Sequence, residues 1–434
     1  MSTNHKTLPI DAQSAASISK NGLRLGLVDT DDTQAFERWT QADNRGFYGE
    51  WLNEKDAAAL MDAMRERRTT GVYDDSGADA STPIGTVNSW PVAMTVPGGS
   101  AIDVWGISSV TVAPTHRRKG IARALLEGEL RTASALGMPF AALTVSEATI
   151  YSRFGFAPAA MAAELEIDTV RARWIGPAAS GRVQYVPRQQ LRNEATALIE
   201  QSRVLTPGEI RGWSQRWDSF FGLTSNTEKE GAKIRAVRYD DADGVPQGFA
   251  LYTLKEHDSD YARHTVTLSH LLALTPDAYA GLWQHVLELD LVATVKAPLR
   301  SVDEPLIWQV VDQRAIATRV HDHLWLRILD VRASLAARTY SAPLDTVIEV
   351  TDDLGFAAGR YRLLIEGGTA TIAATVDAAA LTLSVNELSA LYLGGVSANT
   401  LARAGRIIEH SAGAAAALDT AFRGPVAPWL SIWF

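Results

Sequence analysis

Apolar and polar positions alternate from Ile107 to Val112, and this pattern predicts a half-buried β-strand. The residues that follow are polar and basic, and apolar residues then recur every three or four positions, as on one face of an α-helix. The residues that share this face are Ala122, Leu125, Leu126, Leu130 and Ala133. The pattern therefore predicts a strand, a basic loop and a helix in direct succession.

The loop between this strand and this helix contains Arg117, Arg118, Lys119 and Gly120. The first backbone N–H groups of a helix have no partner within the helix, and a glycine lets the backbone approach a ligand closely. This loop therefore suits a pyrophosphate group. For a basic loop considered alone, an ordinary solvated turn is the more common explanation.

A second motif follows the next predicted strand, which covers residues 140–146. Tyr151 stands directly before the sequence Arg-Phe-Gly-Phe. The loop sequence Arg-Arg-Lys-Gly-Ile-Ala (117–122) resembles the R/Q-x-x-G-x-G/A pattern of the GNAT acyl-CoA N-acetyltransferases. In that family a tyrosine at this place is the acid that protonates the departing coenzyme A. The resemblance therefore implies acetyl-CoA as the acetyl donor.

The remaining part of the first 175 residues also alternates between strand and helix patterns. We expect strands at residues 22–28, 72–73, 84–90 and 165–170, and helices at residues 33–39 and 54–68. Phe47, Tyr48 and Trp51 lie between the two helices. Burial in a core is the more common use of such aromatic residues. Because the early helices of GNAT folds wall the acceptor site, the alternative is that these aromatic residues line it.

The middle of the chain repeats the first motif without its charge. When Gly281 is aligned with Gly120, residues 271–281 match residues 110–120, and another helix pattern follows. The three basic residues are replaced by Ala-Tyr-Ala (278–280), and Asp277 adds a negative charge. Such a loop could not offset the charge of a pyrophosphate. We therefore expect a second GNAT-like domain without cofactor at residues 176–322, after a first domain at residues 1–175.

The last part of the chain, residues 323–434, has the pattern of a separate α+β domain. We expect strands at residues 324–331, 346–350, 359–365 and 369–374, and helices at residues 386–393 and 398–421. The chain ends on the apolar run Trp429 to Phe434. Most chain ends are polar and frayed, so this run predicts a tail anchored in an interior. A buried terminal carboxylate must then have a partner.

The composition of the chain excludes several reaction types and partners. The 434 residues include no cysteine, which excludes disulfides and a thiol nucleophile, so acetyl transfer should be direct. A net charge of −9 argues against nucleic acid as a partner, although it is ordinary for this length. No apolar run is long enough for a membrane span and no signal peptide is evident, so we expect a cytoplasmic protein without a membrane partner. His321 and His323 lack a third ligand, so no metal is expected.

From about residue 23 to Phe434 the chain resembles the actinobacterial enhanced intracellular survival (Eis) acetyltransferases. The resemblance is carried by Val-Ala-Pro-Thr-His-Arg-Arg-Lys-Gly (112–120), Ser-Glu-Ala-Thr-Ile-Tyr-Ser-Arg-Phe-Gly-Phe (146–156), Leu-Trp-Leu-Arg-Ile (324–328), Leu-Tyr-Leu-Gly (391–394) and the terminal phenylalanine. It implies an α/β (α+β) fold of tandem GNAT-like domains with mixed central sheets and a C-terminal sterol-carrier-like domain. It also implies a homohexamer that acetylates several amines of one small molecule, with aminoglycosides as the family's known acceptors.

The same resemblance assigns roles to residues of this chain. It makes Tyr151 the general acid and the carboxylate of Phe434 the general base. The expected acetyl-CoA contacts are Val110, Thr111, Val112, Arg117, Arg118, Lys119, Gly120, Ile121, Ala122, Arg123, Ser146 and Glu147. Phe47, Trp51 and Trp433 are the expected acceptor contacts. Some relatives carry a carboxylate where this chain has Trp433, and a pocket without it would hold polycations less tightly.

Two other functions remain open at this point. An acetyltransferase that acts on lysine side chains of proteins or peptides would need an open groove. A lipid-carrying assembly protein would use the sterol-carrier-like domain and would release no thiol from acetyl-CoA.

Overall fold

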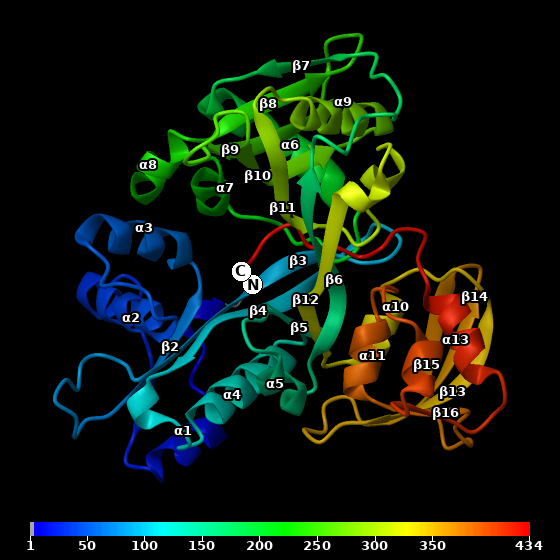
Figure 1. Ribbon diagram of the computed structural model, residues 1–434. Helices are drawn as coiled ribbons and strands as arrows, with labels where there is room; N and C mark the ends of the chain where they lie inside the picture. The colour runs from blue at the N-terminus through cyan, green and yellow to red at the C-terminus, as the bar shows by residue number, and fades with distance from the viewer. Residues whose placement is uncertain (1–3) are drawn as a thin grey trace.

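The computed structural model describes residues 4–434, and strands alternate with helices up to residue 168 (Figure 1). These elements are α1 (Ala12–Ser19), β1 (Arg24–Leu27), α2 (Thr33–Gly46), α3 (Glu54–Met64), β2 (Arg68–Tyr73), β3 (Gly85–Thr95), β4 (Ala101–Val112), α4 (Ile121–Ala135), β5 (Phe140–Thr144), α5 (Ala148–Tyr151) and β6 (Ala157–Asp168). The predicted strand, basic loop and helix correspond to β4, the residues after it, and α4.

A second alternation follows and ends in a long strand. Its elements are β7 (Arg182–Tyr185), α6 (Arg188–Arg203), α7 (Ser214–Phe220), α8 (Glu228–Gly231), β8 (Arg235–Asp240), β9 (Pro246–Lys255), β10 (His264–Ala273), α9 (Pro276–Leu287), β11 (Val292–Arg300) and β12 (Ile316–Ile328). The unit β10-α9-β11 repeats the arrangement of β4-α4-β5, because in each unit a helix joins two parallel strands.

All these strands form one mixed sheet of twelve strands. Their order is β1-β2-β3-β4-β5-β12-β6-β11-β10-β9-β8-β7. The last strand, β12, lies between β5 and β6 and is antiparallel to both. The two halves of the sheet are thus joined by a strand that comes about 170 residues after β5 in the chain.

Helices cover the first half of this sheet on both sides (Figure 1). On one side, α4 packs against β3, β4 and β5, and α1 packs on α4. The predicted apolar face of α4 is confirmed, since Leu125, Leu126, Leu130 and Ala133 are buried. On the other side, α2 and α3 pack together, with α2 against β3 and β4. Within residues 4–434, every helix is too short or too polar to cross a membrane.

The remaining residues form a smaller sheet with its own helices. These elements are α10 (Val331–Ala336), β13 (Leu344–Thr351), β14 (Gly359–Glu366), β15 (Thr369–Ala374), β16 (Leu381–Ser384), α11 (Val385–Leu391), α12 (Ala398–Arg403), β17 (Ile407–Glu409) and α13 (Ala414–Phe422). The strands lie in the order β15-β14-β13-β16-β17. The predicted domain boundary at residue 322 falls inside β12, which stays in the large sheet up to Ile328.

Two predicted helices differ from the structure, one at its end and one in its middle. The helix predicted at 54–68 ends at Met64, and Arg68 begins β2 with its side chain buried beside Glu129 of α4. The helix predicted at 398–421 is two helices separated by β17. Gly405 and Gly413 take left-handed φ angles of 72° and 85° there, and these angles end one helix and begin the next.

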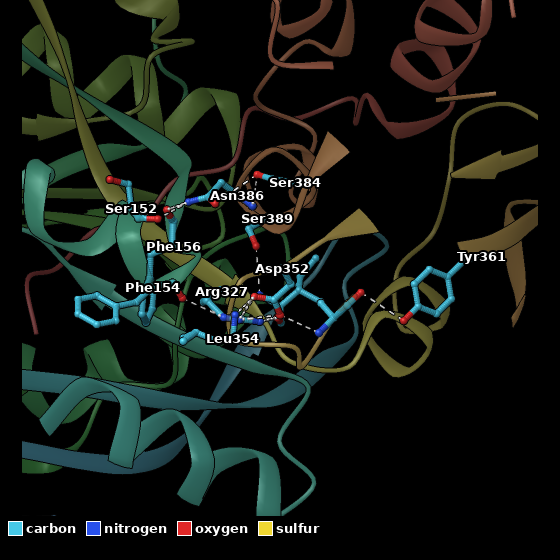
Figure 2. Close-up of polar contacts among 12 residues, drawn as sticks. Ser152, Phe154, Phe156, Arg327, Asp352, Leu354, Tyr361, Ser384, Asn386 and Ser389 are labelled. Carbon is cyan, nitrogen blue, oxygen red and sulfur yellow. Dashed lines mark hydrogen bonds and ion pairs between the residues drawn. The ribbon is translucent and has the colours of Figure 1, made fainter. Parts of the chain in front are cut away.

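A buried ion pair ties the small sheet to the large one (Figure 2). The guanidinium of Arg327 on β12 donates to both carboxylate oxygens of Asp352, at 2.7 and 2.8 Å, and to the backbone oxygen of Phe154 at 3.1 Å. Nearby, the amide of Asn386 donates to the backbone oxygens of Ser152 and Phe156, both at 2.8 Å. The small domain therefore fixes the segment that directly follows Tyr151.

We expect Asp352→Ala to lower the free energy of unfolding by about 3–5 kcal/mol, because the substitution leaves the Arg327 charge buried without its partner. The side chains of this pair are 0% and 2% exposed, so water cannot replace the lost carboxylate. Urea titration followed by tryptophan fluorescence would measure the change. The matched control is Asp353→Ala at the exposed neighbouring position, which should change stability little. Equal stability of the two variants would show that the pair contributes nothing.

Candidate active site

A cavity opens where β4 and β5 separate. These parallel strands are paired only at Trp105 with Ala141 and at Gly106 with Ala142, and they diverge beyond these residues. The cavity measures about 260 Å³. It is lined by Phe47, Ile107, Ser108, Ser109, Val110, Leu143, Thr144, Val145, Ser146, Tyr151, Trp433 and Phe434. The structure thus brings Tyr151 and the last residue of the chain to one cavity.

The basic loop follows the C-terminal end of β4, the same end of the strand at which the cavity opens. Arg118 and Gly120 have left-handed φ angles of 67° and 73°, and Gly120 is the N-cap residue of α4. No side chain caps this helix, so its first N–H groups are available to an anion. The side chains of Arg117, Arg118 and Lys119 are exposed. This arrangement suits a pyrophosphate group in both charge and backbone direction.

The other residues expected to contact acetyl-CoA fall into two groups, those that line the cavity and those whose side chains are buried elsewhere. Val110 and Ser146 line the cavity. The side chain of Thr111 is buried, and its hydroxyl lies 2.6 Å from that of Thr86. Ile121 is also buried in the core. Thr111 and Ile121 can therefore meet a ligand only through their backbone atoms, as can be expected of a strand edge and a helix end.

Tyr151 ends the short helix α5 and is buried against the core. Burial, with a smaller contribution from the charge of Glu147, raises the pKa of its phenol to about 12. The phenol therefore stays protonated at neutral pH. A protonated group in a cavity can donate a proton to a departing anion.

The C-terminal tail, residues 429–434, is held along its length by hydrogen bonds. The backbone N–H of Trp429 donates to the oxygen of Pro207 at 2.9 Å, and the N–H of Ser431 donates to Glu209 at 2.9 Å. His323 lies with its Nε2 atom 2.9 Å from the oxygen of Ile432. Burial lowers the pKa of His323 to about 4, so its ring is neutral and donates through Nε2–H. The tail therefore has a defined path into the cavity.

The last residue is fixed by a single threonine. The hydroxyl of Thr144, at the end of β5, donates to a terminal oxygen of Phe434 at 2.7 Å and accepts from its N–H at 3.3 Å. The phenyl ring packs edge-on against Trp90, with ring centroids 5.6 Å apart. The terminal carboxylate is thereby held beside the cavity wall that β5 provides.

The aromatic residues after α2 do not form a core, so that prediction was wrong. Phe47, Tyr48 and Trp51 are 53%, 78% and 81% exposed, because a turn at Tyr48 with φ of 61° directs this segment outward. Of the three residues expected to contact the acceptor, Phe47 and the half-exposed Trp433 line the cavity and Trp51 does not. The Tyr48 hydroxyl instead accepts a hydrogen bond from Arg117 at 3.2 Å.

Sequence reasoning missed several residues of the cavity. Thr144 could have been suspected as the polar end of an apolar strand. Ser108 and Ser109 are two consecutive polar residues within the strand that was predicted at 107–112. Ser109 has a left-handed φ of 57°, at a point where the register between β3 and β4 shifts. Such a bulge changes the direction in which side chains point. In the sequence, only the two consecutive polar residues indicate that it is there.

His116 and His323 each contact another part of the chain. His116 lies with Nε2 3.0 Å from a carboxylate oxygen of Asp74, which ties the basic loop to the turn between β2 and β3. His323 contacts the tail, and Asp322 accepts from the indole of Trp325 at 2.7 Å. Within residues 4–434, no three acidic or histidine side chains gather as a metal site would require.

In the second half of the large sheet, the start of α9 corresponds to the start of α4. Groups of the protein itself occupy this helix end. The side chain of Thr275 accepts a hydrogen bond from the N–H of Ala278 at 3.1 Å, which caps α9. The carboxylate of Asp277 accepts from the N–H of Ser180 at 3.0 Å and also from the hydroxyl of Tyr239. A pyrophosphate at this helix end would meet a fixed negative charge.

Comparison with known domain families divides the chain into three matches. Residues 30–159 match an acetyltransferase (GNAT) domain, residues 210–328 match another acetyltransferase (GNAT) domain, and residues 331–431 match a sterol carrier protein domain. The expected fold of two GNAT-like domains and a sterol-carrier-like domain is therefore confirmed.

Several whole proteins are also similar to this chain. An uncharacterised N-acetyltransferase of Streptomyces coelicolor is 35% identical over 92% of this chain and 97% of its own length. N-acetyltransferase Eis of Mycobacterium tuberculosis is 33% identical over 82% of this chain and 87% of its own. The crystal structure of Eis1 from Mycobacterium abscessus superimposes with a TM-score of 0.79 at 29% identity, covering 95% of this chain and all of that one.

Proposed function

Because the chain belongs to the Eis family of GNAT N-acetyltransferases, we propose that it transfers the acetyl group of acetyl-CoA directly to amines of small molecules with several amino groups. The observation that supports this most is the cavity between β4 and β5, where a protonated phenol and a terminal carboxylate lie together. These two groups are the acid and the base that such a transfer needs.

The proposed reaction begins with the acceptor amine. An ammonium nitrogen has no free lone pair and must lose two protons to become an amide nitrogen, one before it attacks the thioester and one after the carbon–nitrogen bond has formed. The carboxylate of Phe434 is the base that accepts a proton from this nitrogen. The carbon–nitrogen bond forms, and the carbonyl oxygen gains a negative charge that a backbone N–H near Val112 can stabilise. The carbon–sulfur bond then breaks, and Tyr151 gives its proton to the thiolate of coenzyme A. No thiol of the protein takes part, since the chain has no cysteine.

The donor substrate would lie along β4 and the basic loop. The exposed Arg117, Arg118 and Lys119 and the uncapped start of α4 would hold its pyrophosphate. The second GNAT domain would bind no acetyl-CoA, because Asp277 and its partners occupy the equivalent helix end. The two domains share a fold, but the loop before α4 is basic and uncapped, whereas the loop before α9 is acidic and capped. We base the two assignments on this difference.

The acceptor we propose is an aminoglycoside or a polyamine, acetylated at several positions. The half-exposed Phe47 and Trp433 flank the cavity and offer aromatic surfaces on which a cation can bind. By its family resemblance we also propose that the protein is a homohexamer in the cytoplasm. Acetylation of lysine side chains in peptides and a lipid-carrying role are the alternatives that an experiment must separate.

We expect thiol release from acetyl-CoA in the presence of an aminoglycoside or a polyamine at least ten times faster than with a lysine peptide. The cavity is small and its mouth is aromatic, which suits a flexible or compact polycation better than a folded surface. Thiol release would be followed with a chromogenic disulfide, and mass spectrometry would count the acetyl groups on each acceptor. A preference for the peptide would overturn the proposed acceptor class. Bound lipid together with no thiol release would overturn the enzymatic function.

A further inference from the structure

A chain of buried polar groups runs behind the cavity wall and has no part in the reaction described above. The hydroxyl of Ser109 donates to the carboxylate of Asp43 at 3.0 Å. The amide of Asn88 donates to the Ser109 oxygen at 3.0 Å, and Arg67 donates to the Asn88 oxygen at 3.1 Å. These residues come from α2, β4, β3 and the turn directly before β2, so four separate segments build this chain of contacts.

Ser109 is the member of this chain that reaches the cavity. A serine hydroxyl has one donor and two acceptor positions. The donor is used by Asp43 and one acceptor position by Asn88, so one acceptor position remains. A group with a free acceptor position at a cavity wall can take a hydrogen bond from an ammonium group in that cavity.

Asp43 is suited to receive a proton. One of its carboxylate oxygens, Oδ1, is buried and has no hydrogen-bond partner within residues 4–434. Burial raises the pKa of the Asp43 carboxyl to about 7, although the hydrogen bond from Ser109 and the charge of Arg67 oppose the shift. A carboxylate with this pKa gains and loses its proton close to neutral pH, which is where a proton acceptor is most effective.

Few charged groups face Asp43 from the elements packed against α2. Arg67 faces it through Asn88, and burial lowers the pKa of Arg67 to about 9, with Arg216 of α7 acting in the same direction. β3 carries no ionisable side chain, and β4 carries only Asp103, which is exposed. The charged residues of α3 are Glu54, Lys55, Asp56 and Asp62, and all but the half-buried Asp56 are exposed. Among residues 4–434, Arg67 is therefore the one charge that competes for the Asp43 carboxylate.

The reaction releases two protons from the acceptor nitrogen, so a second proton acceptor besides Phe434 can take part. An ammonium nitrogen loses two protons when it becomes an amide nitrogen, one before it attacks and one after the carbon–nitrogen bond has formed. One carboxylate can hold one of these protons at a time. Phe434 supplies one such carboxylate, and the cavity wall that β4 provides has Ser109 with Asp43 behind it.

On the basis of the function proposed above, we infer that Ser109 and Asp43 relay the first proton away from the acceptor ammonium. An N–H bond of the ammonium breaks and its proton goes to the Ser109 oxygen, while the Ser109 hydroxyl proton passes to Oδ2 of Asp43. The free amine keeps the electron pair with which it attacks, and Phe434 takes the second proton. Ser109 is then a catalytic residue that touches the substrate, and Asp43 is a positioning residue that orients it and holds the proton.

The test compares Asp43→Asn, Ser109→Ala and the double variant with the wild-type protein between about pH 5.5 and 11. Asparagine keeps an acceptor oxygen for Ser109 but cannot take its proton. Glu37→Gln is the matched control, because it removes a carboxylate from the exposed side of the same helix. The measured quantity is kcat/KM for the amine, from thiol release. Acetyl-CoA binding by calorimetry and the unfolding temperature show whether each variant is folded.

We expect the ratio of wild-type to Asp43→Asn kcat/KM to be about ten to one hundred between pH 7 and 8. The ratio should fall below about pH 6, where Asp43 is already protonated in the wild-type protein. It should also fall above about pH 10, where the amine itself is free. Ser109→Ala should show the same profile, and the double variant should be no slower than either single one.

A ratio that does not change with pH would overturn the relay and leave Asp43 a structural partner of Arg67. Additive losses in the double variant would also overturn it. If Asp43→Asn does not fold, the profile of Ser109→Ala decides by the same criteria. Failure of the proposed function would look different, because the wild-type protein would then release no thiol with any amine.

Discussion

A short peptide extension after Phe434 is expected to lower kcat by a factor of about 10² to 10⁴, the usual contribution of a general base. The extension turns the terminal carboxylate into a peptide carbonyl, which cannot accept a proton. The extension would also have to leave through the cavity, because Thr144 holds the last residue at its wall. The kcat for thiol release with a saturating polyamine would be measured, together with acetyl-CoA affinity, which should not change.

The matched control for this variant is Phe434→Ala. Alanine keeps the terminal carboxylate and both hydrogen bonds to Thr144, and it removes only the ring that packs on Trp90. We expect it to keep most of kcat and to lose some stability. An extended protein that turns over at the wild-type rate would rule out the terminal carboxylate as the base.

Tyr151→Phe is expected to lower kcat by a factor of about 10² to 10⁴, with little change in KM for acetyl-CoA. The substitution removes the only atom of the side chain that can protonate the departing thiolate and keeps the ring that fills the core. Because burial raises the pKa of this phenol to about 12, it stays protonated at every pH below that value. Any loss of rate between about pH 8 and 10 must then come from another group.

Single-turnover measurements would separate the chemical step from product release in this variant. The control is Tyr48→Phe, which removes an exposed hydroxyl that contacts Arg117 next to the basic loop. That change should alter KM for acetyl-CoA slightly and leave kcat as it is. An unchanged single-turnover rate in Tyr151→Phe would show that the thiolate leaves without a proton from this residue.

The parts of the fold that could be predicted are those determined by residues close together in the sequence. The alternation at 107–112 and the helical spacing after Gly120 identified β4 and α4, because each pattern lies within one element. The break between α12 and α13 was missed. Alanine-rich sequence favours a helix throughout this stretch, and only Gly405 and Gly413, with left-handed φ angles, interrupt it.

In the candidate site, too, the residues that lie in local motifs could be predicted and those brought together by packing could not. Tyr151 and the basic loop stand in short motifs, and the apolar end of the chain indicated an anchored tail. Ser109 and Asp43 are 66 residues apart, and their contact depends on a bulge in β4 and on how α2 packs. Thr144 meets Phe434 across 290 residues. Contacts of this kind come from tertiary packing, which a local pattern does not encode.

The place of β12 between β5 and β6 has a consequence for how the protein can be made and dissected. A fragment that stopped near residue 175 would leave β5 and β6 without the strand that separates and pairs them. Unpaired strands offer open backbone groups to other molecules, so such a fragment should aggregate rather than work as a minimal enzyme. During synthesis, β12, which pairs with β5 and β6 of the first half, emerges after all the other strands of the second half, so the first half cannot complete its sheet until then.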